Sequence, residues 1–114
     1  MEKTIFGRII DGEIPADKLL ENEDLIAIRD INPQAPTHVL IIPKRPLVGI
    51  SDSTKADDPL LGKLLGAARD LAKDLGLKDG GYRVVINNGE SAGQSVPHLH
   101  LHLLGGRDFR WPPG

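Results

Sequence analysis

Three of the four histidines of this chain, His98, His100 and His102, lie at alternate positions of one short segment, with leucines between them. Side chains alternate between two faces along a β-strand, so a strand over 98–104 would place the three imidazoles on one face and the leucines on the other. Imidazoles at this spacing suit two chemistries. They can bind a metal ion, or one ring can act as a nucleophile at neutral pH while its neighbours support it.

Zinc is the metal that such a histidine set would bind, with a water molecule as the fourth ligand. Metal-bound histidines usually donate their other ring nitrogen to a carboxylate or a carbonyl group. Residues 98–104 contain no carboxylate. We therefore favour nucleophilic catalysis by histidine, and we expect no metal and no other cofactor.

The polar segment before the histidines reads NNGESAGQS and favours a phosphate group as the target. The backbone amides of Gly89 and Gly93 can converge on an anion, and the side chains of Asn87, Gln94 and Ser95 add neutral donors. The net charge of −2 provides no basic field for a polyanion, so local neutral donors would have to hold a phosphate. Attack of imidazole on phosphorus would give a phosphohistidine, which water can break in a second step.

Hydrophobic periodicity predicts an α+β protein with a single domain over residues 1–114. The expected elements are a helix over 4–10 capped by Thr4, a hairpin over 18–30, a strand over 37–43, a helix from Asp57 or Asp58 to Gly76, and strands over 82–87 and 98–104. His38 begins the strand over 37–43 and shares a face with Leu40 and Ile42. It can orient a catalytic ring through one hydrogen bond.

Composition narrows the class of protein further. The chain has no cysteine, so disulfides, thiolate nucleophiles and thiolate metal sites are absent. It shows neither a signal peptide nor an apolar run near the roughly 20 residues that span a bilayer. We expect a cytoplasmic protein that binds neither membranes nor nucleic acids.

The segment His98-Leu99-His100-Leu101-His102-Leu103-Leu104 resembles the signature of the histidine triad (HIT) family. TIFGRIIDGEIPA resembles the opening helix of the family, and LIAIRDINPQAPTHVLIIPK resembles its ribose-contacting strand and the following loop. The segments NNGESAGQSVPHLHLHLLGGR and WPPG resemble its nucleotide-binding branch, the purine nucleoside phosphoramidases. The resemblance implies a five-stranded antiparallel sheet with two helices. It also implies a homodimer with a continuous ten-stranded sheet, to which the tail over 105–114 contributes.

The implied activity is hydrolysis of adenosine or guanosine phosphoramidates, such as AMP joined to a lysine amine, through a covalent nucleotidyl-histidine. By this resemblance His100 is the nucleophile, and His98 and His38 orient it. His102 belongs to the groups that hold the α-phosphate and the leaving group, together with Asn87, Gln94 and Ser95.

The resemblance also assigns a nucleoside site. Asp30 would accept hydrogen bonds from both ribose hydroxyls, and Trp111 would reach the site of the partner subunit. An apolar wall would surround the base, formed by Phe6, Ile9, Ile14, Ile28 and Ile31. From the residues alone, these five are more typical of a hydrophobic core. Ile28 departs from the aromatic residue of some relatives, and Pro97 removes a backbone donor directly before the triad.

Other functions remain open at this point. A dinucleoside polyphosphate hydrolase of the fragile histidine triad branch would use the same nucleophile on a P–O–P bond. A nucleotide-sensing protein would use the same pocket without turnover and act through a partner. A nucleotidyl transferase is disfavoured, because that branch has glutamine where this chain has His102. A histidine-ligated zinc protein would lose its fold or its activity to a chelator.

Overall fold

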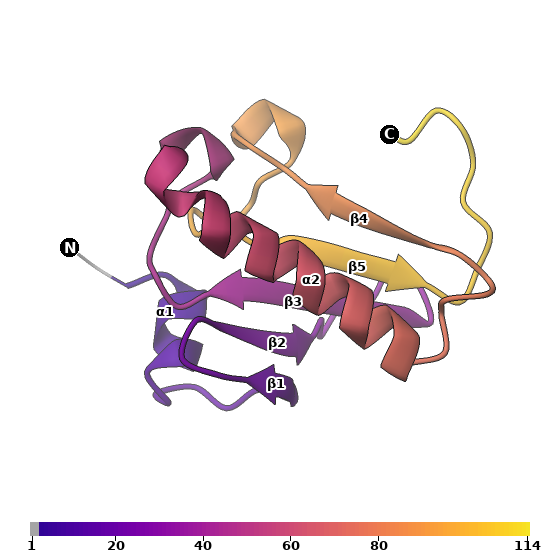
Figure 1. The fold of residues 1–114 in the computed structure, drawn as a ribbon, viewed down its shortest axis with the longest axis horizontal. Helices are drawn as coiled ribbons and strands as arrows, with labels where there is room; N and C mark the ends of the chain where they lie inside the picture. The colour runs from indigo at the N-terminus through magenta and orange to yellow at the C-terminus, as the bar shows by residue number, and fades with distance from the viewer. Residues whose placement is uncertain (1–2) are drawn as a thin grey trace.

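The computed structural model describes residues 3–114 and contains one antiparallel sheet with two α-helices (Figure 1). The α-helices are α1 (Ile5–Ile10) and α2 (Asp58–Asp74). The strands are β1 (Lys18–Glu21), β2 (Leu25–Arg29), β3 (Thr37–Pro43), β4 (Tyr82–Ile86) and β5 (Leu101–Gly105). Short 3₁₀ turns lie at η1 (Ile50–Asp52), η2 (Lys55–Asp57) and η3 (Glu90–Ala92). The strand order is β1-β2-β3-β5-β4, so the predicted five-stranded α+β fold is confirmed.

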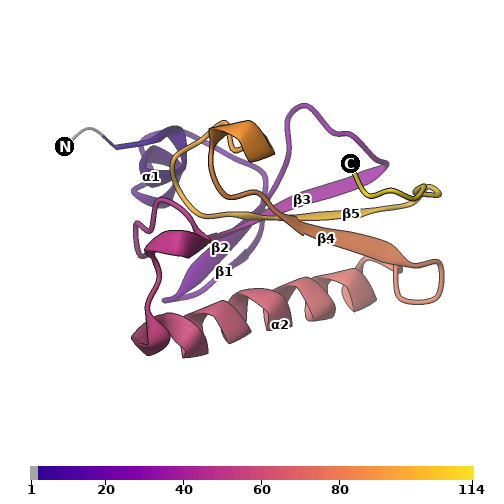
Figure 2. The ribbon, with the colours of Figure 1, turned by 90° about the horizontal axis from the view of Figure 1, so that it is seen from above.

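The two faces of the sheet bury different residues because side chains alternate along each strand. Figure 2 shows α2 along one face and α1 on the other. Beneath α2 the sheet contributes Leu25, Ala27, Val39, Ile41, Leu101 and Leu103. On the opposite face, Phe6 and Ile9 of α1 pack with Ile26, Ile28, Leu40 and Ile42. None of the helices within residues 3–114 is long and apolar enough to cross a membrane.

Strand β3 lies at the centre of the sheet and brings two histidines together. It pairs with β2 on one side and with β5 on the other. Leu40 is opposite His102 of β5, and His38 is two residues before Leu40 on the same face. The prediction that His38 shares a face with Leu40 and Ile42 is therefore confirmed, and this face is the one that carries α1.

The prediction of a strand over 98–104 is wrong at its start. Strand β5 begins at Leu101, so His98 and His100 lie in the segment before it, which forms no strand. Pro97 has no N–H to donate, and the His98 N–H bonds back to the Val96 carbonyl at 2.8 Å. Leu99 is nevertheless buried under α2, opposite in direction to the histidines, so the alternation continues without the sheet ladder.

Helix α2 begins and ends close to the predicted residues. Pro59 lies in its first turn, and Gly76 follows its end with a φ of 77°, a conformation that glycine adopts without strain. Leu64 and Leu71 of this helix are buried, whereas Leu65 is 52% exposed.

A leucine of the buried stripe in β5 should contribute far more stability than an exposed leucine of α2. We expect Leu101→Ala to lower the free energy of unfolding by about 3 kcal/mol, because it removes a side chain from the closed core. Leu65→Ala, at a half-exposed position, should change it by less than about 1 kcal/mol. Urea denaturation at neutral pH measures both values. Equal losses in the two variants would contradict this division of the core.

Candidate active site

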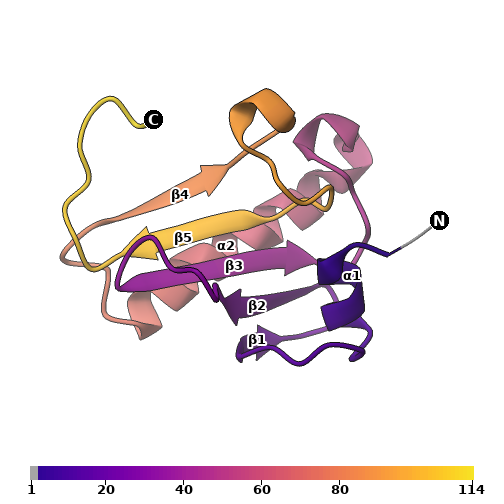
Figure 3. The ribbon, with the colours of Figure 1, turned by 180° about the vertical axis from the view of Figure 1, so that it is seen from behind.

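A pocket of about 580 Å³ opens on the sheet face that carries α1, within the size range of small-molecule sites. Figure 3 views the molecule from this side, with α1 beside the ends of β2 and β3. The predicted site residues that line the pocket are Phe6, Ile9, Ile14, Ile28, Asp30, Ile31, Ser95, His100 and His102. A separate cleft of about 630 Å³, between α2 and β1, contains none of the four histidines.

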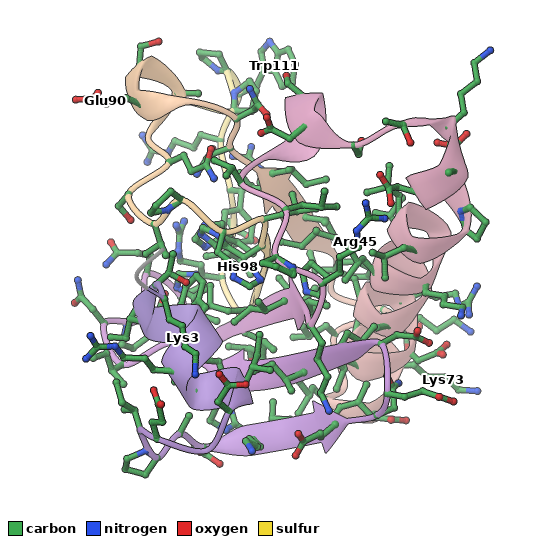
Figure 4. All side chains as sticks on the ribbon, turned by 90° about the vertical axis from the view of Figure 1, so that its left-hand side faces the viewer. Lys3, Arg45, Lys73, Glu90, His98 and Trp111 are labelled. Carbon is green, nitrogen blue, oxygen red and sulfur yellow. The ribbon has the colours of Figure 1, made fainter. Side chains whose placement is uncertain are left out.

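His98 does not line the pocket and is almost completely buried, with 3% of its surface exposed. Its Nε2 lies 2.8 Å from the Pro43 carbonyl oxygen, which can only accept, so Nε2 carries the hydrogen and donates it. The unprotonated Nδ1 then faces the Thr4 hydroxyl at 3.5 Å. That hydroxyl also accepts the Gly7 N–H as the N-cap of α1. Figure 4 shows His98 in the interior, close to α1.

His100 is held by its own neighbour. Its Nδ1 donates to the His98 carbonyl oxygen at 2.8 Å. In the neutral ring the hydrogen is therefore on Nδ1, and Nε2 keeps a free lone pair. The Phe6 ring meets the imidazole edge-on, with centroids 4.9 Å apart, and His100 lines the pocket. An imidazole with a fixed tautomer and a free nitrogen at a pocket wall has what a nucleophile needs.

His38 and His102 form a hydrogen-bonded pair with a defined direction. The Gln34 N–H donates to His38 Nδ1 at 3.0 Å, so the neutral His38 ring carries its hydrogen on Nε2. That Nε2 lies 2.9 Å from His102 Nδ1 and donates to it, which leaves the His102 hydrogen on its own Nε2. Asp30 Oδ2 lies 3.5 Å from His38 Nε2. His102 therefore presents a hydrogen-bond donor at the pocket.

Burial favours the uncharged form of three of the rings, His38, His98 and His102. It is the main cause that lowers the pKa of His102 to about 4, helped by the proximity of His100 and His38. Burial also lowers the pKa of His98 and of His38, although Asp30 partly opposes the change at His38. Neutral imidazoles match the hydrogen-bond directions inferred from their partners.

In the loop over 87–95, the backbone amides of Gly89 and Gly93 do not form the predicted anion site. The Gly89 N–H donates to Gln94 Oε1 at 2.8 Å, and the Gly93 N–H donates to the Glu90 carbonyl at 2.9 Å. Both amides are therefore used within the loop, and the prediction that they converge on an anion is wrong. Gln94 also donates to the carbonyls of Val48 and Val96, so its amide fastens the loop.

The remaining predicted residues occupy different positions. Asn87 is half-buried, and neither it nor Gly93 lines the pocket. Asp30 Oδ1 accepts the Asn32 N–H at 2.8 Å, which orients the carboxylate at the pocket edge. Ile31 stands at the rim with 98% of its surface exposed. Trp111 is 84% exposed and lies at the periphery, away from this pocket (Figure 4).

Residues 11–109 match the family model of the HIT domain. The chain belongs to the HIT domain family. It is similar to a 14 kDa zinc-binding protein of Zea mays, 55% identical over 113 residues, spanning 97% of this chain and 88% of the maize protein.

Two solved structures share the fold of this HIT domain. A HIT family hydrolase from Legionella pneumophila has a TM-score of 0.96 and 49% identity, covering 98% of this chain and 100% of that chain. A histidine triad nucleotide-binding protein from Candida albicans has a TM-score of 0.83 and 37% identity, covering 96% and 83% respectively. The predicted HIT resemblance is thus confirmed.

One group in the HIT site offers metal ligands, namely Asp30, His38 and His102, whose ligand atoms lie within 4.8 Å of one another. Its hydrogen bonds do not fit a metal. A metal on His38 Nε2 would leave the hydrogen of the neutral ring on Nδ1, where it would face the Gln34 N–H at 3.0 Å. Two donors would then oppose each other. The donor set instead fits a hydrogen-bonded pair of neutral rings.

Several positioning groups were not predicted from the sequence. Gln34 and Pro43 act on the histidines through their backbone, and backbone donors and acceptors carry no residue-type signal. Thr4 was predicted as a helix cap, but its contact with His98, 94 positions away, was not. Only the sequence position of Thr4, before a short helix, gave a clue.

The lowered pKa values predict that this HIT domain loses stability as the pH falls. The unfolded chain takes up a proton at His102 near 6.5, whereas the folded chain resists until the pH approaches about 4. Between these values the unfolded state binds more protons, so the free energy of unfolding decreases with decreasing pH. The decrease should be smaller in His102→Asn, whose amide oxygen can still accept from His38. Urea denaturation across this pH range measures it, and identical pH dependence in both proteins would contradict the prediction.

Proposed function

We propose that this HIT protein is a purine nucleoside phosphoramidase that hydrolyses P–N bonds through a covalent nucleotidyl-histidine at His100. The observation that carries the proposal is the free Nε2 of His100, fixed by the hydrogen bond from Nδ1 to the His98 carbonyl beside a pocket that also contains Asp30. The similarity of the chain to a HIT family hydrolase from Legionella pneumophila and to a histidine triad nucleotide-binding protein from Candida albicans supports the proposal.

In the first step His100 Nε2 attacks phosphorus. A bond forms between Nε2 and phosphorus while the bond from phosphorus to the amine nitrogen breaks. The electron pair leaves with that nitrogen, which takes a proton from solvent and departs as the amine. The imidazole becomes a cation, and its Nδ1–H stays bonded to the His98 carbonyl oxygen. The fixed dipole of that carbonyl group stabilises the developing positive charge. The His102 Nε2–H supplies a donor for the phosphate or leaving group.

In the second step water attacks the phosphorus of the nucleotidyl-histidine. The bond between phosphorus and Nε2 breaks, and its electron pair returns to the ring. The attacking water releases a proton to solvent, and the nucleoside monophosphate leaves. The two steps together consume one water molecule and return His100 to its neutral tautomer.

The pocket divides into two parts that suit the two ends of a nucleoside. The Asp30 carboxylate lies at the edge of the pocket and would accept hydrogen bonds from both ribose hydroxyls. The apolar wall would hold the base, and most of it is also core. Phe6, Ile9 and Ile28 are buried and belong to the cluster under α1, so the core and the binding interpretations are both supported for them.

The homodimer with a continuous ten-stranded sheet is part of this proposal. The same holds for the tail over 105–114, with Trp111 reaching the partner's pocket. The exposure of the Trp111 ring is consistent with a residue that meets a second subunit. The cytoplasmic location stays a prediction.

One observation favours the alternative of a zinc protein, namely that the maize relative is named a zinc-binding protein. The hydrogen-bond directions at His38 argue against a zinc site in this chain. A nucleotide-binding protein without turnover would have the same pocket, and a dinucleoside polyphosphate hydrolase would have the same nucleophile. Turnover measurements separate these possibilities from the phosphoramidase.

The first test compares adenosine phosphoramidate hydrolysis by the wild type and His100→Ala, each with and without EDTA. We expect wild-type turnover to survive EDTA and kcat to fall by about a thousandfold or more in the variant, because the nucleophile is missing. AMP binding should persist in His100→Ala. Substantial turnover in the variant would refute the covalent role, and AMP binding without wild-type turnover would support the binding protein. Faster cleavage of diadenosine polyphosphate would support the alternative hydrolase.

The second test addresses the ribose contact. Asp30→Asn should raise KM for an adenosine phosphoramidate by about tenfold, because charge-assisted hydrogen bonds to the hydroxyls weaken. The same substitution should leave KM for the 2′,3′-dideoxy analogue almost unchanged. Steady-state kinetics on both substrates measures the difference. An equal rise of KM for both would show that Asp30 does not contact the ribose.

A further inference from the structure

The chain segment after β5 returns across the loop that follows β2. The Arg107 Nε donates to the Gln34 carbonyl oxygen at 3.0 Å, across 73 positions of sequence. Gly106 also packs against the ring of Pro36 in that loop. A Cβ at Gly106 would lie 2.9 Å from Pro36 Cβ, and the φ of Gly106 is 89°. Glycine at this position permits the close approach that brings Arg107 to the loop.

Arg107 is itself held in place by its neighbours. Its guanidinium lies 4.2 Å from the centroid of the Phe109 ring, and its Nη1 donates to the Asp108 carbonyl at 3.0 Å. Arg83 of β4 lies over the same ring at 5.1 Å and donates to the Arg110 carbonyl. Both arginines therefore fasten this segment, but of the two only Arg107 has a hydrogen bond to Gln34.

Gln34 connects this exposed contact with the histidines. Its carbonyl accepts from Arg107, and its N–H donates to His38 Nδ1 at 3.0 Å. Gln34 is exposed and lies in a loop that forms no strand, so its backbone is not held by the sheet ladder. The hydrogen bond from Arg107 therefore restrains the Gln34 backbone, which the sheet does not.

We propose that Arg107 is a positioning residue for the His38–His102 pair. By holding the Gln34 carbonyl, it keeps the Gln34 N–H directed at His38 Nδ1. The His38 hydrogen then stays on Nε2, directed at His102 Nδ1, and the His102 hydrogen stays on the Nε2 that donates in the pocket. Without the restraint, His38 Nδ1 loses its donor, and the two tautomers of the pair become closer in energy.

Nuclear magnetic resonance of ¹⁵N-histidine-labelled protein tests this without any substrate. In the wild type, His38 and His102 should each show an unprotonated Nδ1 and a protonated Nε2. In Arg107→Ala the nitrogen shifts of both rings should move toward the average of two tautomers, and Arg107→Lys should restore them in part. Arg83→Ala is the matched control, because it disturbs the same Phe109 contact but leaves the Gln34 contact intact.

Kinetics gives a second measurement, which rests on the proposed phosphoramidase function. Arg107→Ala should lower kcat by about fivefold for amines that leave poorly, as expected for the loss of one hydrogen bond that supports a donor. Good leaving groups should be affected less, KM should change little, and Arg83→Ala should match the wild type.

Wild-type nitrogen shifts in Arg107→Ala would overturn the proposal, as would equal changes in Arg107→Ala and Arg83→Ala. A loss of kcat that is independent of the leaving group would show a general structural role and contradict it too. Absence of turnover in the wild type would refute the proposed function instead, and the nitrogen shifts would still decide the role of Arg107.

Discussion

The hydrogen bond from His100 Nδ1 to the carbonyl of His98 is the interaction on which the rest of the site depends. It determines which nitrogen of His100 has a free lone pair and in which direction the ring faces. It holds only if the His98 backbone is fixed, and the donation from His98 Nε2 to the Pro43 carbonyl at the end of β3 fixes it. The centre of the sheet thus orients a ring that lies outside the strand ladder.

Hydrogen bonds hold all four histidines, and burial acts together with them on His38, His98 and His102. Removing an imidazole from water favours its neutral form, but each buried nitrogen then needs a partner. Across the part of the chain that the structure describes, every buried side-chain nitrogen and oxygen has one. For the histidines, three of these partners are backbone groups, of Gln34, Pro43 and His98, and the others are the Thr4 hydroxyl and the bond between His38 and His102. The site is therefore fixed by loop and strand ends, which explains how a small chain can order four polar rings in its interior.

The alternation of histidine and leucine was sufficient to predict the two faces of the sheet. Leu99, Leu101 and Leu103 are buried under α2, while the histidines lie on the side of α1. The sequence did not predict that the strand begins at Leu101, because this depends on where β3 ends and on the bonds around Pro97. The sequence also predicted that the backbone amides of Gly89 and Gly93 donate to a phosphate, but both amides donate to acceptors within their own loop. Backbone contacts across long sequence separations have no local pattern from which to infer them.

Trapping the covalent nucleotidyl-histidine decides whether His100 is the nucleophile. The protein would be mixed with an adenosine phosphoramidate, quenched with base within milliseconds to preserve a P–N bond, digested and analysed by mass spectrometry. We expect one peptide that carries an adenylyl group on His100, appearing before the steady state and disappearing as substrate is consumed. A wild-type protein that turns over without any such adduct, or with the adduct on another residue, would contradict it.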